Sequence, residues 1–372
     1  RPPAAATSSS RSSNLIPLII CSHGRGQLPP KPQGDAAPAP RIPPPRVLLR
    51  HFAILLVRCR LPSSVPTYNG KRSCILLPSQ MLLEGWDSRE GWGSWASGSW
   101  APPWHQTSSS CDITVWNRTK SKCDPLLSLG AKFESSPARV ASSCDVTFAM
   151  LADPESAFEV ACGANGAAEG MAAGKGYVDV STVDDATSKL IGKRITSTGA
   201  SFLEAPVSGS KKPAEDGLLI FLTAGDESLY KRVAPLLDVM GKSRFYLGDV
   251  GNGAAMKLVV NMVMGSMMVS FAEGLLLSEK VGLDPNTVVE VISQGAINAP
   301  MFSLKGPSMV KAAYPTAFPL KHQQKDLRLA LALAESVSQP IPTAAAANEL
   351  YKVAKSLGLA DQDFSAVIEA LK

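Results

Sequence analysis

The sequence predicts an α/β protein: a Rossmann-type parallel sheet followed by an all-helical C-terminal region. Two observations predict this class. From Cys111 to Val250, short apolar runs rich in β-branched residues alternate with helical stretches, which is typical of a parallel sheet covered by helices. After Val250 the strand-like runs stop and helical patterns continue to the C-terminus.

The strand-like runs are short and apolar, as in DITVW and DVTFAML, and stretches of helical pattern separate several of them. Strands are expected at 112–116, 145–151, 176–180, 201–204 and 218–223. The intervening helices are expected at 154–162, 184–198 and 227–240.

The helical region is expected to open with one long apolar helix over 253–281. Further helices are expected to start near Asp284-Pro285, Pro319, Ile341 and Gln362. Four methionines of the long helix suggest burial between domains or subunits, although plain core packing explains them as well; they are Met262, Met264, Met267 and Met268.

Residues 1–110 differ in composition from the rest. They contain 16 of the 29 prolines, twelve Lys/Arg and four Asp/Glu, whereas residues 111–372 contain 25 Lys/Arg and 28 Asp/Glu. The Arg- and Ser-rich opening, which starts at Arg1 and has no acidic residue before Asp35, favours an organellar transit peptide. The alternative is a disordered Pro-rich tail of a cytoplasmic protein. The Trp-rich stretch 68–104 fits neither interpretation and could be a gene-model error.

Several function classes have little support. The net charge of +5 comes from the N-terminal segment, so residues 111–372 show no basic nucleic-acid surface. His322 is the one histidine beyond residue 110, which argues against a His-based metal site and a Ser-His-Asp triad. The apolar run 47–57 is too short to cross a membrane and is interrupted by Arg50 and His51.

The stretch GNGAAMKLVVN places Lys257 and Asn261 four residues apart, on one face of a helix that starts near Gly251. An ammonium and an amide on one face can hold a carbonyl oxygen, and the lysine can protonate it as a hydride arrives. The alternative is an ordinary amphipathic helix with a solvated lysine.

The first strand ends in Asn117-Arg118-Thr119. In dinucleotide folds an acid at the end of the second strand binds the ribose of NAD, whereas an arginine there suits the 2′-phosphate of NADP. The sequence therefore favours NADP, although Asn-Arg-Thr is also a good turn.

Three further groups of polar residues are candidate ligand contacts. Ser208-Gly209 forms a turn whose backbone N–H groups could face a carboxylate, unless it is a surface hairpin. Thr182 lies at the carboxyl end of a strand, where ligands bind such sheets or where a helix cap forms. Lys325 and Asp326 could reach the cleft from the first turn of a helix, or be solvated there.

From about Asp112 to Lys372 the chain resembles the β-hydroxyacid dehydrogenases, which include 3-hydroxyisobutyrate dehydrogenase and tartronate semialdehyde reductase. It is most similar to the plant NADPH-dependent glyoxylate/succinic semialdehyde reductases, and its C-terminal tail to their organellar isoform. The motifs that support this are VWNRTKSKCD, YVDVSTVD, EAPVSGSKKPAEDG, GNGAAMKLVVNM and FPLKHQQKD.

The resemblance implies an NADP-binding domain over 111–250 and a helical substrate and dimerisation domain over 251–372. It implies NADPH-dependent reduction of a small aldehyde acid, glyoxylate or succinic semialdehyde, by a homo-oligomer in the chloroplast and possibly the mitochondrion. Lys257 matches the family's catalytic lysine and Asn261 its partner. The remaining matches are to substrate-binding positions, at Ser208, Gly209, Phe318 and Asp326, and to cofactor-binding positions, at Thr182 and Lys325.

One departure concerns the cofactor. Family members begin with a strand and a GxGxMG loop that cradles the pyrophosphate. The chain lacks this motif; Gly91-Trp92-Gly93 is followed by Ala96 where the third glycine belongs. The expected Rossmann sheet is therefore incomplete. Two alternatives follow: a non-catalytic homologue unable to hold the cofactor, and a sister 3-hydroxyisobutyrate dehydrogenase, whose substrate also has a carboxylate.

Overall fold

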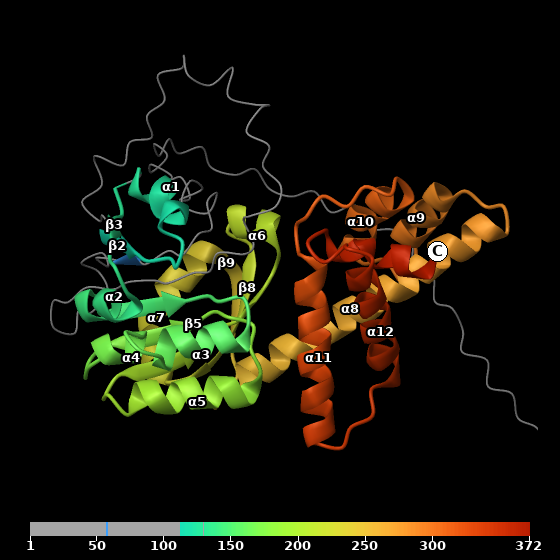
Figure 1. Cartoon of the computed structure of the whole chain (residues 1–372). Helices are drawn as coiled ribbons and strands as arrows, with labels where there is room; N and C mark the ends of the chain where they lie inside the picture. The colour runs from blue at the N-terminus through green and yellow to red at the C-terminus, as the bar shows by residue number, and fades with distance from the viewer. Residues whose placement is uncertain (1–56, 59–111, 129) are drawn as a thin grey trace, which may run out of the picture. The chain divides into compact units, whose positions relative to one another are not determined.

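The computed structural model describes residues 57–58, 112–128 and 130–372, all within one compact unit, Pro43–Lys372 (Figure 1). The disordered or transit-like segment expected over 1–110 lies outside the described residues, apart from Val57-Arg58. The strands are β1 (Val57–Arg58), β2 (Asp112–Val115), β3 (Lys132–Phe133), β4 (Val146–Ala149), β5 (Gly176–Asp179), β6 (Ser201–Glu204), β7 (Val207–Ser208), β8 (Leu219–Gly225) and β9 (Gly241–Tyr246).

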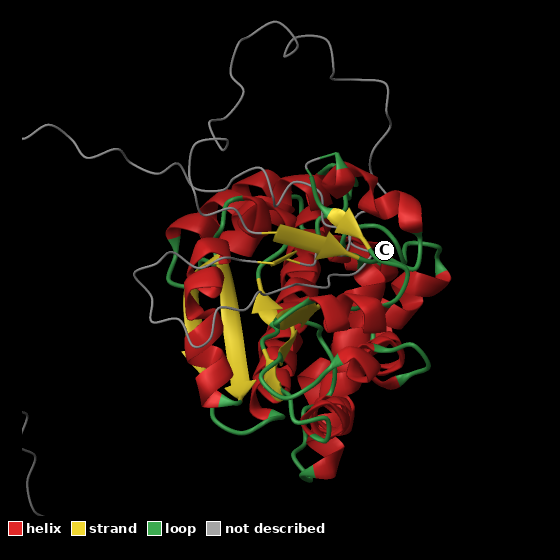
Figure 2. Ribbon diagram, turned by 90° about the vertical axis from the view of Figure 1, so that its left-hand side faces the viewer, coloured by secondary structure: helices red, strands yellow, loops and turns green. Residues whose placement is uncertain are grey.

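Helices pack around these strands (Figure 2), and helices alone follow β9 to the C-terminus. They are η1 (Lys120–Cys123), α1 (Asp124–Leu127), α2 (Pro137–Ser143), α3 (Pro154–Cys162), α4 (Ala167–Gly170), α5 (Asp185–Thr196), α6 (Lys211–Glu215), α7 (Glu227–Met240), α8 (Asn252–Lys280), α9 (Pro285–Gln294), α10 (Pro300–Val310), α11 (Leu320–Ser336), α12 (Pro342–Ser356) and η2 (Phe364–Leu371). The predicted class, a Rossmann-like sheet followed by helices, is confirmed.

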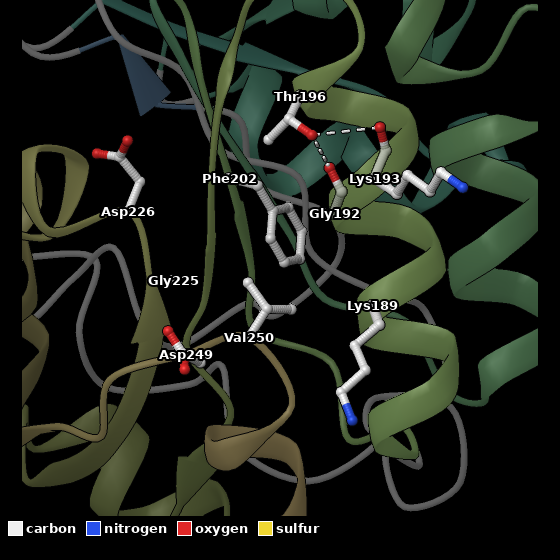
Figure 3. A pocket seen from close by; sticks show the side chains of 9 residues that line it. All are labelled: Lys189, Gly192, Lys193, Thr196, Phe202, Gly225, Asp226, Asp249 and Val250. Carbon is white, nitrogen blue, oxygen red and sulfur yellow. Dashed lines mark hydrogen bonds between the residues drawn. The ribbon is translucent and has the colours of Figure 1, made fainter.

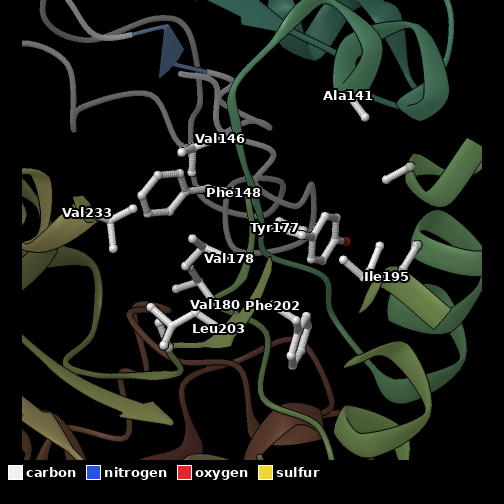
Figure 4. Close-up of a cluster of buried hydrophobic side chains, with 14 of the residues drawn as sticks. Ala141, Val146, Phe148, Tyr177, Val178, Val180, Ile195, Phe202, Leu203 and Val233 are labelled. Carbon is white, nitrogen blue, oxygen red and sulfur yellow. The ribbon is translucent and has the colours of Figure 1, made fainter. Parts of the chain in front are cut away.

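The central sheet has apolar residues on both faces, as expected for strands covered by helices on each side. Tyr177 and Phe202 stack on one face beside Ile195 of α5 (Figure 4). On the other face Val178 lies with Val233 of α7. The side chains on both faces are buried, so close packing fixes the strands and the positions of their carboxyl ends.

The parallel arrangement was predicted correctly for part of the sheet only. The strand order is β4-β5-β6-β8-β7, with β9 beside β8; β4, β5 and β6 are parallel. However, β8 is antiparallel to both β6 and β7. The reason is the short connection from Ser208 to Leu219, which contains only the five-residue α6 and is shorter than a parallel crossover needs.

A second, small sheet has the order β1-β2-β3, in which β2 and β3 are parallel. In a complete dinucleotide fold a long parallel strand lies between the strands that correspond to β2 and β4. Here β1, two residues long and antiparallel to β2, also contacts β4. Within the described residues, no parallel strand followed by a glycine loop occupies this position.

The helical region was predicted well, with two differences. Helix α10 was not predicted, because Pro300 at its start and Gly306-Pro307 within it indicate breaks. The helix expected near Gln362 is the 3₁₀ helix η2, which starts at Phe364. By length and composition α8 could cross a membrane, but a buried core helix of a soluble protein passes the same test.

Candidate active site

Lys257 and Asn261 lie on one face of α8, as their spacing predicts. Both side chains are buried, with exposed fractions of 6% and 2%. The Lys257 Nζ donates a hydrogen bond of 2.9 Å to Asn261 Oδ1. A solvated lysine on an amphipathic helix is therefore the wrong interpretation.

Burial sets the proton affinity of Lys257. It lowers the pKa of this ammonium to about 8, because the charged form loses its hydration; the carboxylate of Asp326 opposes this and the charge of Lys325 adds to it. A pKa near the working pH lets a group both hold and release a proton, as a general acid requires.

Helix α11 supplies a carboxylate to this pair. The Asn261 Nδ2 donates a hydrogen bond of 2.5 Å to Asp326 Oδ2, and Asp326 is 1% exposed. The other oxygen, Oδ1, lies 3.2 Å from Lys325 Nζ but accepts no hydrogen bond. Lysine, amide, carboxylate and second lysine thus form one continuous buried chain, which we call the Lys257 cluster.

The Lys257 cluster reaches the sheet through Lys325. Its Nζ donates a hydrogen bond of 2.6 Å to the backbone oxygen of Thr182, in the loop after β5. Two candidate cofactor residues, 143 positions apart, are therefore in direct contact. In open α/β sheets ligands bind outside the carboxyl ends of the strands, which is where this contact lies.

Two supporting residues were not singled out from the sequence. Gln323, which is fully buried, donates from Nε2 to the backbone oxygen of Asn261 at 2.9 Å. Glu204, at the end of β6, accepts hydrogen bonds from the first turn of α8. A charged residue ending an otherwise apolar strand was the available signal for Glu204.

The Ser208-Gly209 turn follows β7, a strand that contacts α8. Gly209 has φ 137°, and a Cβ there would lie 2.8 Å from Leu219 Cδ2, so this turn requires glycine. Ser208 is half-buried. Lys212, which follows this turn, is ion-paired with Asp216, which offsets its charge.

Phe318 precedes α11 and is half-buried. Its ring stacks on His322 with centroids 6.3 Å apart and meets Phe364 edge-on at 5.9 Å. Burial, together with Lys325, lowers the pKa of His322 to about 4, so this histidine is neutral at physiological pH. The three rings of Phe318, His322 and Phe364 therefore form an uncharged aromatic group.

At the end of β2, Asn117 is buried while Arg118 and Thr119 are exposed. The Asn117 Oδ1 accepts a hydrogen bond of 2.8 Å from the backbone N–H of Thr119, which makes the turn that the sequence allowed. Its Nδ2 is buried with no hydrogen-bond partner. Among the described residues, no hydrogen bond or ion pair joins this group to the Lys257 cluster.

A surface pocket of about 310 Å³ lies between α5 and the loop before α8 (Figure 3). Its lining includes Lys189, Lys193, Asp226 and Asp249, and none of the predicted site residues. No group of three or more His, Cys, Asp or Glu side chains in the described part of the chain could hold a metal ion.

Family models and known relatives match most of the described chain. Residues 104–248 match the model of the NAD-binding domain of 6-phosphogluconate dehydrogenase, and residues 251–371 that of the NAD-binding domain of NADP-dependent 3-hydroxyisobutyrate dehydrogenase. The chain is 78% identical over 264 residues to a chloroplastic glyoxylate/succinic semialdehyde reductase 2 of Arabidopsis thaliana, covering 71% of this chain and 74% of that protein.

It is also 58% identical over 260 residues to the reductase 1 of the same plant, covering 70% of this chain and 90% of that protein. Among solved structures, 3-hydroxyisobutyrate dehydrogenase of Salmonella typhimurium is 25% identical with a TM-score of 0.63, covering 68% of this chain and 90% of the other. The chain therefore belongs to the glyoxylate/succinic semialdehyde reductase family, oxidoreductases that act on CH–OH groups with a nicotinamide cofactor.

Proposed function

We propose that the chain catalyses NADPH-dependent reduction of glyoxylate to glycolate and of succinic semialdehyde to 4-hydroxybutyrate, with Lys257 as the proton donor. The observation that supports this best is the Lys257 cluster, in which hydrogen bonds and one ion pair lead from the buried Lys257 to the carboxyl edge of the sheet. The two substrates are those in the names of the Arabidopsis relatives.

NADPH, when bound, supplies the hydride that adds to the aldehyde carbon. The aldehyde oxygen then gains negative charge, and the Lys257 ammonium gives it a proton. Asn261 accepts a hydrogen bond from Lys257 and so fixes the direction of the ammonium. Asp326 holds the Asn261 amide and favours the charged lysine through its own charge.

The substrate would be held at both ends. Its carboxylate suits the backbone of the Ser208-Gly209 turn, because exposed N–H groups in a turn with positive φ form an anion-binding nest. Phe318, backed by neutral His322, and Asp326 would close the pocket from the helical region. Both proposed substrates carry a carboxylate, which the Ser208-Gly209 turn would hold.

The cofactor residues fit NADPH at two places. After β2, Asn117 lies where an NAD-binding fold has an acid, and its side chain accepts a hydrogen bond from Thr119, so no carboxylate is present there for a ribose hydroxyl. Arg118 is exposed and can contact a 2′-phosphate. Thr182 and Lys325 would lie at the nicotinamide end.

One observation favours the alternative, a non-catalytic homologue. The two-residue antiparallel β1 contacts β4 where the fold family has a parallel strand that leads into its phosphate loop. The intact Lys257 cluster argues against loss of function, because a chain without catalysis has no need to bury a lysine at this cost.

We further propose two domains, 111–250 for the cofactor and 251–372 for substrate and dimerisation. Exposed apolar residues on α8, among them Val259, Val263 and Leu277, support a homo-oligomer. The name of the reductase 2 relative supports a chloroplast location. The mitochondrion is proposed as a second destination, and the name of that relative does not bear on it.

The test follows NADPH absorbance with purified chain and each substrate, and NADP⁺ reduction with 3-hydroxyisobutyrate. A matched version replaces the residues before Asp112 with the N-terminal part of the reductase 2 relative. Values of kcat/KM for glyoxylate and succinic semialdehyde that exceed the value for 3-hydroxyisobutyrate support the proposal. No turnover in either version would contradict it, and a preference for 3-hydroxyisobutyrate would identify the sister enzyme.

A further inference from the structure

The long helix α8 is capped by a residue from another element. Glu204, the last residue of β6, is buried with an exposed fraction of 2%. Its Oε1 accepts hydrogen bonds from the backbone N–H groups of Gly251, Gly253 and Ala254 at 2.9, 2.6 and 3.3 Å. Its Oε2 accepts one from the Ser188 hydroxyl of α5.

This helix has no cap of its own. Gly251 occupies the N-cap position with φ 107° and has no side chain to accept the first N–H groups. Asn252 donates its side chain backwards, to the oxygen of Leu247. The first turn of α8 therefore depends on the Glu204 carboxylate, which also suits the positive end of the helix dipole.

The contact is close enough to fix where α8 begins. A Cβ on Gly253 would lie 2.5 Å from the Leu222 oxygen and 3.0 Å from Glu204 Oε1, so only glycine permits this approach. Lys257 follows Gly253 by four residues and Asn261 by eight, so both lie on the same side of the helix. A shift at Gly253 therefore passes directly to the Lys257 ammonium.

Glu204 and Thr182 hold the helical region at adjacent strand ends. Glu204 of β6 is the register partner of Asp179 of β5, and Thr182 follows Asp179 by three residues. One strand end binds the start of α8 and the other binds Lys325 of α11. Lys257 and Lys325 belong to the same cluster, so both attachments define its position over the sheet.

We propose that Glu204 is a positioning residue of the reductase: it sets the place of α8, and thereby of Lys257, relative to the carboxyl ends of the strands. The inference rests on the proposed function of Lys257. Glu204 does not act on Lys257 through charge, because burial and Lys325 account for the lowered pKa of this lysine, with Asp326 opposing them. A misplacement of about 1 Å can cost about 100-fold in rate, which is the size of effect expected.

Two variants separate position from stability. Glu204→Asp keeps the charge but shortens the side chain by one methylene, so α8 must move to keep its cap. Glu204→Gln keeps the length but loses the charge. The control is Asp226→Asn, which weakens the cap of α7, where Asp226 Oδ1 accepts from Leu229 N at 2.7 Å and no site residue is present.

The thermal midpoint and the rate of Lys257 acetylation by acetic anhydride, read by mass spectrometry, are measured on the full chain. The kcat and the KM values for glyoxylate and NADPH are measured on the full chain and on the version with the N-terminal part of the reductase 2 relative. We expect all three variants to lower the midpoint by a few degrees. Only the two Glu204 variants should lower kcat, by about 10- to 100-fold with KM for NADPH unchanged, and alter the acetylation rate of Lys257 severalfold.

If the Glu204 variants keep kcat and the acetylation rate of Lys257 within twofold, as the control does, the positioning role is wrong and Glu204 is a stabilising cap. The acetylation rate needs no cofactor. If neither the wild-type chain nor the version with the N-terminal part of the reductase 2 relative shows turnover, the proposed function fails, while the labelling comparison still decides whether Glu204 places Lys257.

Discussion

Lys325 Nζ donates a hydrogen bond of 2.6 Å to the backbone oxygen of Thr182, and so joins the first turns of α11 to the loop after β5. The same ammonium lies 3.2 Å from Oδ1 of Asp326, the carboxylate of the Lys257 cluster. One lysine therefore connects the buried acid–amide–lysine chain to the edge of the sheet where a nicotinamide ring is expected.

In the version with the N-terminal part of the reductase 2 relative, replacing Lys257 by Met should remove the proton donor while keeping most of the buried volume. We expect kcat to fall by about 10²- to 10⁴-fold, the usual contribution of a general acid, with NADPH affinity nearly unchanged. Steady-state kinetics and a cofactor fluorescence titration measure the two quantities. Loss of NADPH binding or of folding would instead show that Lys257 is a structural residue.

The rate should fall as the pH rises through about 8. Burial lowers the pKa of Lys257 to about 8, and only its protonated form can donate, so activity is lost on the alkaline side of that pKa. The Asp326 carboxylate raises this pKa, so Asp326→Asn should move the alkaline limb to lower pH. A pH–kcat profile of both proteins checks this; an unmoved limb would assign the titration to another group.

NADPH should bind the chain weakly. Its sequence lacks a GxGxxG motif, and its β1 is a two-residue antiparallel strand. We expect little change in cofactor fluorescence at micromolar NADPH, and strong binding by the version with the N-terminal part of the reductase 2 relative. Micromolar affinity of the unchanged chain would refute the prediction.

The buried ion pair of Lys305 and Asp363 should be important for stability. The Asp363 Oδ2 lies 2.7 Å from Lys305 Nζ and also accepts from the backbone N–H groups of Ala317 and Phe318. Removing one partner of a buried pair costs about 3–5 kcal/mol, so Lys305→Met should lower the free energy of unfolding by that order.

Lys352→Met is the matched control for this prediction, because Lys352 pairs with Glu349 on the surface. An exposed pair contributes at most about 1 kcal/mol. Urea unfolding of both variants measures the difference. If both variants lose the same free energy of unfolding, the attraction between Lys305 and Asp363 is offset by the cost of removing the two charges from water.

Much of the fold was readable from the sequence because local patterns control it. The strand 201–204 and the helices 154–162 and 227–240 have the predicted bounds, since each has a clear apolar period and a clear break. The direction of β8 was not readable, because it depends on the length of the preceding connection and on pairing with β6 and β7. Proline and glycine inside α10 hid that helix.

For the site, the sequence by itself determined which residues share a helix face: the spacing of Lys257 and Asn261 requires their contact once α8 forms. Only the tertiary structure decided that Lys257 is buried, that Asp326 and Lys325 complete its cluster, and that Glu204 caps its helix from β6. The contacts of Glu204 with Gly251 and of Lys325 with Thr182 join residues 47 and 143 positions apart. Periodicity reports a residue's own element, whereas burial and proton affinity depend on the elements that pack against it.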